Sequence, residues 1–174
     1  MRMPKPKLSA LLLLLSSLAF AQEGPGLGVP ASPEEIAGWD ISISPDGENL
    51  PAGSGTAAQG ESVYVIECLV CHGPNGEGAI EPRLVGGHGT IDTANAVKTV
   101  GSYWPYATTV FDYIRRSMPF QLPGSLTDNE VYALTAYLLE LNGIIDENLV
   151  LNADTLSAVE MPNRDGFVWA WEED

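Results

Sequence analysis

Two cysteines and a histidine lie within five consecutive residues of this sequence, as Cys68-Leu69-Val70-Cys71-His72. Two thiols three positions apart have the spacing at which each can form a thioether with one vinyl group of a haem. The histidine that follows is then placed to bind the iron as its proximal ligand. The pattern therefore predicts one covalently bound haem c, held by Cys68, Cys71 and His72.

Two other kinds of site use closely spaced cysteines. In an exported protein such a pair also forms a redox-active dithiol or a short-loop disulfide. A zinc site needs four ligands, and beyond this motif the chain has one more histidine, His88, and no more cysteines. Haem attachment is the interpretation we favour over both.

A haem iron that only transfers electrons needs a second axial ligand, and a methionine thioether is the commonest choice in small cytochromes c. Of the four methionines, two lie among the first three residues. Met118 follows His72 by 46 positions and directly precedes a proline, and we predict that it is the sixth ligand. Met161 and His88 are the alternatives.

Three further residues are candidates for holding the haem in place. The Nδ1–H group of His72 needs a carbonyl acceptor that fixes the ring, and Pro82 or a near neighbour is expected to supply it. Arg83 or Trp104 is expected to bind a haem propionate.

The N-terminus has the pattern of a signal peptide, with three basic residues, an apolar stretch over 8–18 and the cleavage motif Ala19-Phe20-Ala21. We predict removal of residues 1–21 and an exported, periplasmic protein. The apolar stretch is shorter than the roughly 20 residues that a spanning helix needs. An uncleaved anchor is the alternative, and no later stretch predicts a membrane span.

The mature chain is strongly acidic. Removal of residues 1–21 takes away three of the eight basic residues and no acidic ones, which leaves 5 Lys and Arg against 23 Asp and Glu and a net charge of −18. Such a charge argues against nucleic acid and anionic membrane surfaces as partners. It favours a basic redox partner downstream, unless the acidity serves solubility alone.

Periodicity and turn residues predict an all-α protein with one domain over residues 56–143. Helices are expected over 56–68, over 106–116 and from an N-cap at Thr127 to a C-terminal Gly143. Residues 74–104 should be loop-rich, with a short helix within 92–100. A Gly- and Pro-rich arm over 22–55, with little regular structure, is expected to pack on its own domain or on a partner. A loosely patterned extension follows over 144–174.

With these elements placed, residues 56–143 resemble class I cytochromes c. Gly60 and Tyr64 facing residues 134–138 are similar to that family's crossed N- and C-terminal helices. A closer resemblance is to the monohaem cytochrome c subunit of periplasmic sulfite and sulfane dehydrogenases of sulfur oxidation. It rests on the segments Gly38-Trp39-Asp40-Ile41, Pro45-Asp46-Gly47, Leu50-Pro51-Ala52-Gly53-Ser54-Gly55, Val100-Gly101-Ser102-Tyr103-Trp104-Pro105-Tyr106-Ala107, Phe111-Asp112-Tyr113-Ile114-Arg115-Arg116-Ser117-Met118-Pro119-Phe120 and Met161-Pro162-Asn163-Arg164-Asp165-Gly166-Phe167.

This resemblance implies a partner subunit with a molybdenum cofactor, which oxidises sulfite or a protein-bound sulfane sulfur and passes electrons singly to the haem. It also implies Met118 as sixth ligand and an arm and tail that bind the partner. Sulfite oxidation removes two electrons with oxygen transfer, so the chain alone is expected to be an electron-transfer subunit and not an enzyme. A free-standing cytochrome c that carries electrons to an oxidase is the alternative.

Overall fold

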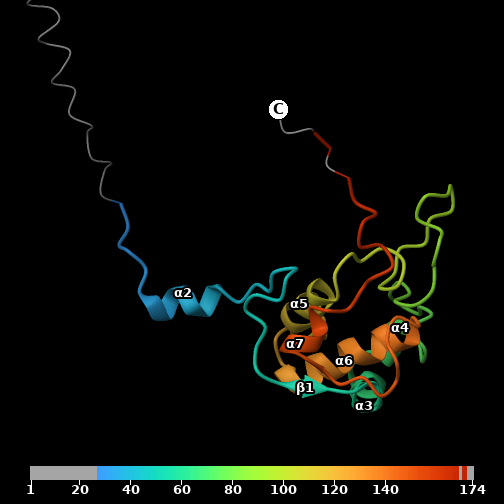
Figure 1. Cartoon of the computed structure of the whole chain (residues 1–174). Helices are drawn as coiled ribbons and strands as arrows, with labels where there is room; N and C mark the ends of the chain where they lie inside the picture. Colours follow the sequence, from blue (N-terminus) through green and yellow to red (C-terminus); the bar gives the residue numbers. More distant parts are fainter. Residues whose placement is uncertain (1–26, 169, 172–174) are drawn as a thin grey trace, which may run out of the picture. The chain divides into compact units, whose positions relative to one another are not determined.

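The computed structural model describes residues 27–168, 170 and 171, and the chain divides into two units, Met1–Asp40 and Ile41–Asp174 (Figure 1). The signal peptide predicted for residues 1–21 lies outside the described residues. Helix α2 (Pro33–Trp39) belongs to the first unit, and the other described helices and strands belong to the second.

Helix α2 lies where the sequence predicted little regular structure, so that prediction is wrong for residues 33–39. Its N-terminus is closed by a reciprocal pair of hydrogen bonds. The Glu35 N–H donates to the Ser32 hydroxyl at 3.2 Å, and the Ser32 N–H donates to the Glu35 carboxylate at 2.8 Å. Pro33 stands at the first helical position, where its fixed φ suits a helix. This local capping box outweighs the Gly- and Pro-rich composition around it.

The three main helices predicted from the sequence are present in the second unit, with ends that differ by one or two residues. They are α3 (Ala57–Glu67), α5 (Ala107–Ser117) and α6 (Asp128–Leu141), and the one-turn helix α4 (Leu69–His72) follows α3 directly. Capping boxes begin α3 at Thr56 and α6 at Thr127.

The short helix predicted within 92–100 is absent from this described segment, which forms turns and extended backbone instead. The Val97 N–H donates to the hydroxyl of Thr90 at 2.9 Å, and the Asn95 N–H donates to the hydroxyl of Thr93 at 3.3 Å. Threonine hydroxyls here take backbone donors that a helix would use.

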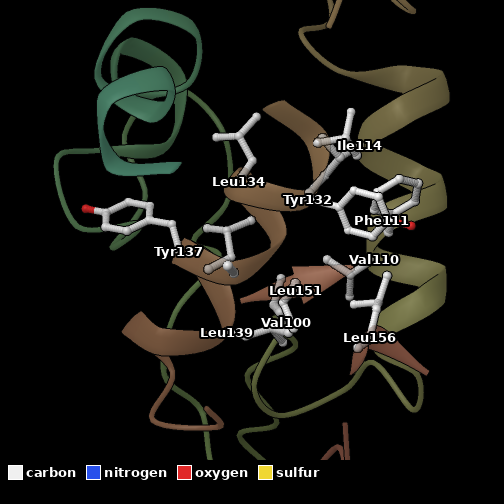
Figure 2. Close-up of a cluster of buried hydrophobic side chains, with 14 of the residues drawn as sticks. Val100, Val110, Phe111, Ile114, Tyr132, Leu134, Tyr137, Leu139, Leu151 and Leu156 are labelled. Carbon is white, nitrogen blue, oxygen red and sulfur yellow. The ribbon is translucent and has the colours of Figure 1, made fainter. Parts of the chain in front are cut away.

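Helix α6 is the central element of the second unit. Its residues 131–139 are all buried, as expected of a helix that is covered on every side. Helix α3 crosses it on one side and α5 packs on another. In the core, the rings of Phe111 and Tyr132 lie 4.5 Å apart between their centroids (Figure 2). The ring centroids of Tyr64 and Tyr137 lie 5.3 Å apart.

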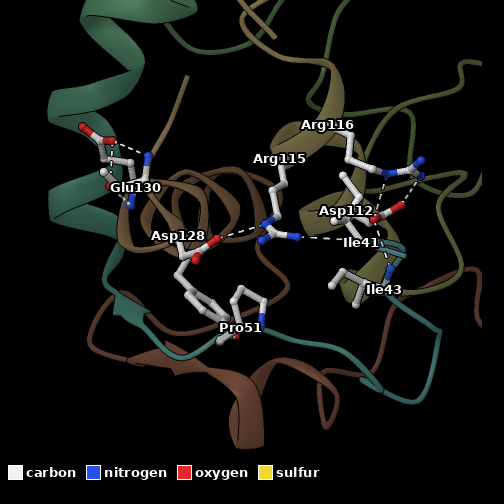
Figure 3. Close-up of polar contacts among 10 residues, drawn as sticks. Ile41, Ile43, Pro51, Asp112, Arg115, Arg116, Asp128 and Glu130 are labelled. Carbon is white, nitrogen blue, oxygen red and sulfur yellow. Dashed lines mark hydrogen bonds and ion pairs between the residues drawn. The ribbon is translucent and has the colours of Figure 1, made fainter. Parts of the chain in front are cut away.

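Residues 41–55, which we call the strap, run along α5 and α6 and are bound to them through backbone groups (Figure 3). The Ile43 N–H donates to the Asp112 carboxylate at 3.1 Å, and the Tyr132 hydroxyl donates to the Pro51 carbonyl oxygen at 2.9 Å. The strap therefore packs on its own domain, which is one of the two outcomes expected for the arm over 22–55.

The C-terminal extension also contributes to the core. Strand β2 (Leu151–Asn152) pairs antiparallel with β1 (Ser54–Gly55), and helix α7 (Ala153–Leu156) follows it. The sequence analysis predicted none of these short elements, so an otherwise all-α unit contains one two-residue strand pair. Four apolar side chains of the extension are buried, namely Leu151, Leu156, Val159 and Met161.

Candidate functional site

The cysteine–histidine motif lies at the junction of α3 and α4. Cys68 ends α3, and Cys71 and His72 lie on α4, whose single turn brings the two cysteines to one side of the helix. Gly73 ends α4 with a φ of 81°, a conformation that favours glycine. Two hydrogen bonds hold the loop that follows: the Gly78 N–H donates to the His72 carbonyl at 2.8 Å, and the Glu81 N–H donates to that of Cys71 at 2.8 Å.

The His72 ring is oriented by a backbone carbonyl. Its Nδ1 atom lies 3.0 Å from the Pro82 carbonyl oxygen. Because a carbonyl oxygen can only accept a hydrogen bond, Nδ1 carries the proton in this pair, and Nε2 keeps the lone pair that a metal requires.

His72 faces a cavity of about 510 Å³. The cavity brings together the seven residues that the sequence analysis favoured for the haem site: Cys68, Cys71, His72, Pro82, Arg83, Trp104 and Met118. Its walls are mainly apolar and come from the 84–100 loop and helices α5 and α6, through Leu84, Val100, Val110, Ile114, Leu134 and Leu138. A large apolar cavity with a few polar groups on its lining is what a bulky cofactor needs.

The structure separates the three candidates for a sixth ligand. Met118 lines the cavity, just past the C-terminus of α5. Met161 is 3% exposed in the hydrophobic core and is not part of the cavity lining, so it fills core space. His88 is also outside the lining and lies against Gly101.

Arg83 is distinguished from the four other basic residues of the described chain. Arg115 and Arg116 form ion pairs with Asp128 and Asp112. Lys98 and Arg164 lie over the rings of Tyr103 and Tyr106. Among the residues that the structure describes, Arg83 is the one basic residue with neither an ion pair nor an aromatic ring as partner. It lines the cavity, where its guanidinium group could bind an anionic group of a ligand. Trp104, the other candidate for a propionate, packs edge-on against Tyr113 with the ring centroids 5.5 Å apart.

The environment of Cys68 argues against a redox-active dithiol. Burial, with smaller contributions from the nearby Glu67 and Cys71, raises the pKa of this thiol to about 12. Reactive cysteines have lowered pKa values, because the thiolate is the nucleophile. Within residues 27–168, 170 and 171, no group of three His, Cys, Asp or Glu side chains is arranged to hold a metal ion.

The sequence analysis missed a role for Tyr64 at this site. It assigned this residue to the helix crossing only, whereas the hydroxyl also donates to the Gly73 carbonyl at 2.8 Å and the side chain lines the cavity. Burial, with a smaller effect of Cys68, raises the pKa of the Tyr64 hydroxyl, so it stays protonated as the donor. The available signal was its position one helical turn before Cys68.

The comparisons with known proteins agree with this geometry. The family model for cytochrome c matches residues 57–142. A chain in the crystal structure of the sulfane dehydrogenase SoxCD from Paracoccus pantotrophus is 44% identical, with a TM-score of 0.77, over 83% of this chain and 71% of that one. This chain belongs to the cytochrome c family.

Curated relatives of this cytochrome c are more distant. Thiosulfate dehydrogenase from Stutzerimonas stutzeri (strain A1501) is 29% identical over 67% of this chain and 32% of its own length. Thiosulfate dehydrogenase from Psychrobacter arcticus (strain DSM 17307 / VKM B-2377 / 273-4) is 24% identical over 78% and 38%. The cytochrome thus spans about a third of the length of the curated relatives it matches.

Membership of this family implies covalent haem c, and the residues present fit that group. The two thiols have the attachment spacing, the His72 ring is held with Nε2 available, and a thioether lines the same apolar cavity. The cytochrome is an electron-transfer protein, related to dehydrogenases of sulfur compounds. Within the described residues, no helix is both long and apolar enough to cross a membrane.

Proposed function

We propose that this cytochrome is the haem subunit of a periplasmic molybdenum-cofactor dehydrogenase that oxidises sulfite or a sulfane sulfur. It accepts electrons one at a time from that subunit and passes them to a downstream redox protein. The observation that carries the proposal is the 44% identity to a chain of a sulfane dehydrogenase over 83% of this chain. That share extends well beyond residues 57–142, which a generic cytochrome c domain explains.

In this proposal each site residue has one task. Cys68 and Cys71 would hold the haem through thioethers, and His72 and Met118 would supply the two iron ligands. The Pro82 carbonyl fixes the His72 ring, and Arg83 or Trp104 binds a propionate. When bound, haem c supplies a one-electron redox couple, whose potential the protein adjusts through ligands, burial and hydrogen bonds.

The apolar walls and the two axial side chains explain why the chain would not oxidise sulfite alone. Leu134, Leu138 and Ile114 form apolar walls of the cavity, and an iron bound by both His72 and Met118 would have no position left for a substrate. Oxygen transfer to sulfur would then belong to the molybdenum subunit. This chain would contribute only electron transfer.

The acidic sequence supports a basic downstream acceptor. The whole chain has a formal net charge of −15, and four of its five basic residues outside the predicted leader are paired with acidic groups or aromatic rings. The mature surface would then attract a cationic partner, with association that weakens as salt increases. Removal of residues 1–21 on export is part of the same proposal.

The packing of the strap suggests where a partner contact outside the core would lie. Residues 41–55 and the extension to Met161 are used in the protein's own core. Residues 22–40 precede that core, and α2 within them buries none of its residues. We therefore assign partner binding to residues 22–40 and propose 41–161 as the electron-transfer domain.

Affinity purification from the native organism tests the subunit role. The tagged full chain should bring down a molybdenum protein in a stoichiometric complex, and deletion of residues 22–40 should weaken the complex while the haem spectrum stays unchanged. Isolation as a monomer, with no molybdenum protein at any salt concentration, would contradict the proposal.

A free-standing carrier is the second candidate, and the self-contained unit Ile41–Asp174 favours it. In that case deletion of residues 22–40 leaves both the electron-transfer rate to the oxidase and the purification behaviour unchanged. Deletion should stop at residue 40, because loss of residues 41–50 would also remove the strap's bond to Asp112.

A further inference from the structure

The last turn of α5 determines where Met118 lies. Met118 is the first residue after this helix, and its backbone N–H donates to the Ile114 carbonyl at 3.0 Å, which continues the helical bonding pattern. Its side chain lines the cavity. Any movement of the end of α5 is therefore passed to the methionine through the backbone.

In the loop that follows, the side chains of Met118 and Leu126 pack against the core, while most other residues are exposed. Residues 118–127 connect α5 to α6 without a helix or strand, and Phe120 and Leu122 are 78% and 64% exposed. Two turn-type hydrogen bonds stabilise the loop locally. The Leu122 N–H donates to the Pro119 carbonyl, and the Ser125 N–H donates to the Leu122 carbonyl. Neither bond connects it to α3 or to the body of α6.

Arg115 closes this loop at its base. Its Nε atom donates to Asp128 Oδ1 at 2.9 Å, which joins the last turn of α5 to the first residue of α6 (Figure 3). Its Nη1 atom donates to the Ile41 carbonyl oxygen in the strap at 3.4 Å. One guanidinium thus connects α5, α6 and the strap.

Asp112 makes the second connection, one turn earlier. Its carboxylate accepts from the Ile43 N–H at 3.1 Å and pairs with Arg116 on the same helix (Figure 3). The Asp112 side chain is only 11% exposed, against 44% for that of Arg116. Removal of the partners of a carboxylate this buried is costly, because it leaves an uncompensated charge away from water.

We propose that Asp112 and Arg115 are positioning residues that hold Met118 in the cavity by fixing the last turn of α5 to the strap and to α6. The inference rests on the proposed role of Met118 as sixth ligand. Opening of the 118–127 loop would withdraw the Met118 thioether from the cavity, and both residues would oppose that opening. Neither of them lines the cavity, so each acts only through the backbone.

Imidazole binding to the ferric holoprotein measures this opening. Imidazole takes the sixth position only when Met118 has left it, so its apparent affinity follows the population of the open loop. We expect Arg115→Gln and Asp128→Asn each to raise that affinity about two- to fivefold, as for a partly exposed pair. The Arg115→Gln/Asp128→Asn double variant should raise the imidazole affinity no further than either single variant, because both remove the same ion pair. Asp112→Asn should raise the affinity about tenfold or more, because this carboxylate is buried.

Matched variants separate positioning from a general loss of stability. Arg164→Gln removes an arginine that contacts Tyr106, at the opposite end of α5, and Asp165→Asn changes an exposed turn residue. Both should leave the imidazole affinity unchanged. Leu156→Val lowers the melting temperature through the core and should also leave it unchanged.

Met118→Ala distinguishes the two ways in which the inference can fail. It should abolish the weak long-wavelength absorption band of methionine-ligated ferric haem. If it does so while the Arg115, Asp128 and Asp112 variants bind imidazole like the wild type, the positioning inference is wrong and the ligand assignment stands. If Met118→Ala leaves the band in place, the ligand assignment is wrong and the inference fails with it.

Discussion

Gly60 lies so close to Ala133 that a β-carbon built on Gly60 would stand 2.0 Å from the Ala133 carbonyl oxygen. The neighbour is helix backbone and cannot rotate away as a side chain would. This is the point where α3, which ends at the cysteine–histidine motif, crosses α6. The close approach of the two helices therefore fixes the position of Cys68 relative to the cavity wall.

Gly60→Ala should separate α3 from α6. We expect the free energy of unfolding to fall by about 1–3 kcal/mol or more, as for overpacked sites, as measured by denaturant titration of the holoprotein. Gly38→Ala is the control, because Gly38 lies in helix α2 with nothing within 4 Å of an added β-carbon. Equal stability of the Gly60 and Gly38 variants would show that the helices can move apart freely.

Met161→Ala should destabilise the protein without changing the iron ligation. The side chain is 3% exposed in the core, and loss of a buried methionine side chain costs about 2–5 kcal/mol. The long-wavelength band of the ferric protein should remain, in contrast to its loss in Met118→Ala. Disappearance of the band in Met161→Ala at a temperature where the protein is folded would reverse the ligand assignment.

Local signals explain why the helices and the cavity residues could be predicted from the sequence. Thr127 and Glu130 form the capping box that their spacing predicts. Similarly, Cys68, Cys71 and His72 lie within one turn, so their sequence spacing determines their relative positions. Met118 could be selected because few methionines remain once the first three residues are set aside.

The missed elements depend on contacts between residues far apart in the sequence. Packing of the arm was expected, but the bonds from residues 41–55 to Asp112 and Tyr132 use backbone groups, so the sequence did not indicate where the strap would lie. The pair of β1 and β2 joins residues almost a hundred positions apart through two residues on each strand, too few for an alternating pattern. Helix α2 was missed for the opposite reason, since its capping signal is local but lies among glycines and prolines.

Glu130 should contribute an acid-sensitive part of the stability. Its pKa is lowered by hydrogen bonds from the hydroxyl and the backbone N–H of Thr127. A carboxyl group with a lowered pKa in the folded state adds stability above its unfolded pKa, and this is lost as pH falls through the folded value. On acidification from about pH 5 to pH 3, the unfolding free energy of Glu130→Gln should therefore fall less than that of the wild type. The difference should be at most about 1 kcal/mol, because this group is near the surface.

Asp165→Asn is the comparison for the acid effect, since Asp165 is an exposed turn residue. This variant should follow the wild-type acid profile. Identical profiles for Glu130→Gln and the wild type would mean that the capping box does not depend on the carboxylate charge.

Arg83→Gln should lower the reduction potential of the holoprotein. Arg83 lines the cavity and, among the described residues, has neither an ion pair nor an aromatic partner for its charge. A nearby positive charge favours the reduced state, because reduction removes one positive charge from the iron centre. We expect a decrease on the order of 20–60 mV, which corresponds to an about twofold to tenfold change in the one-electron equilibrium. Lys98→Gln is the control, because Lys98 lies over the ring of Tyr103 and outside the cavity lining.

Spectroelectrochemical titration at low ionic strength compares the reduction potentials of the wild type and the two variants. A reduction potential that falls equally in both variants would indicate a general charge effect. An unchanged potential in Arg83→Gln would contradict an interaction between Arg83 and the haem.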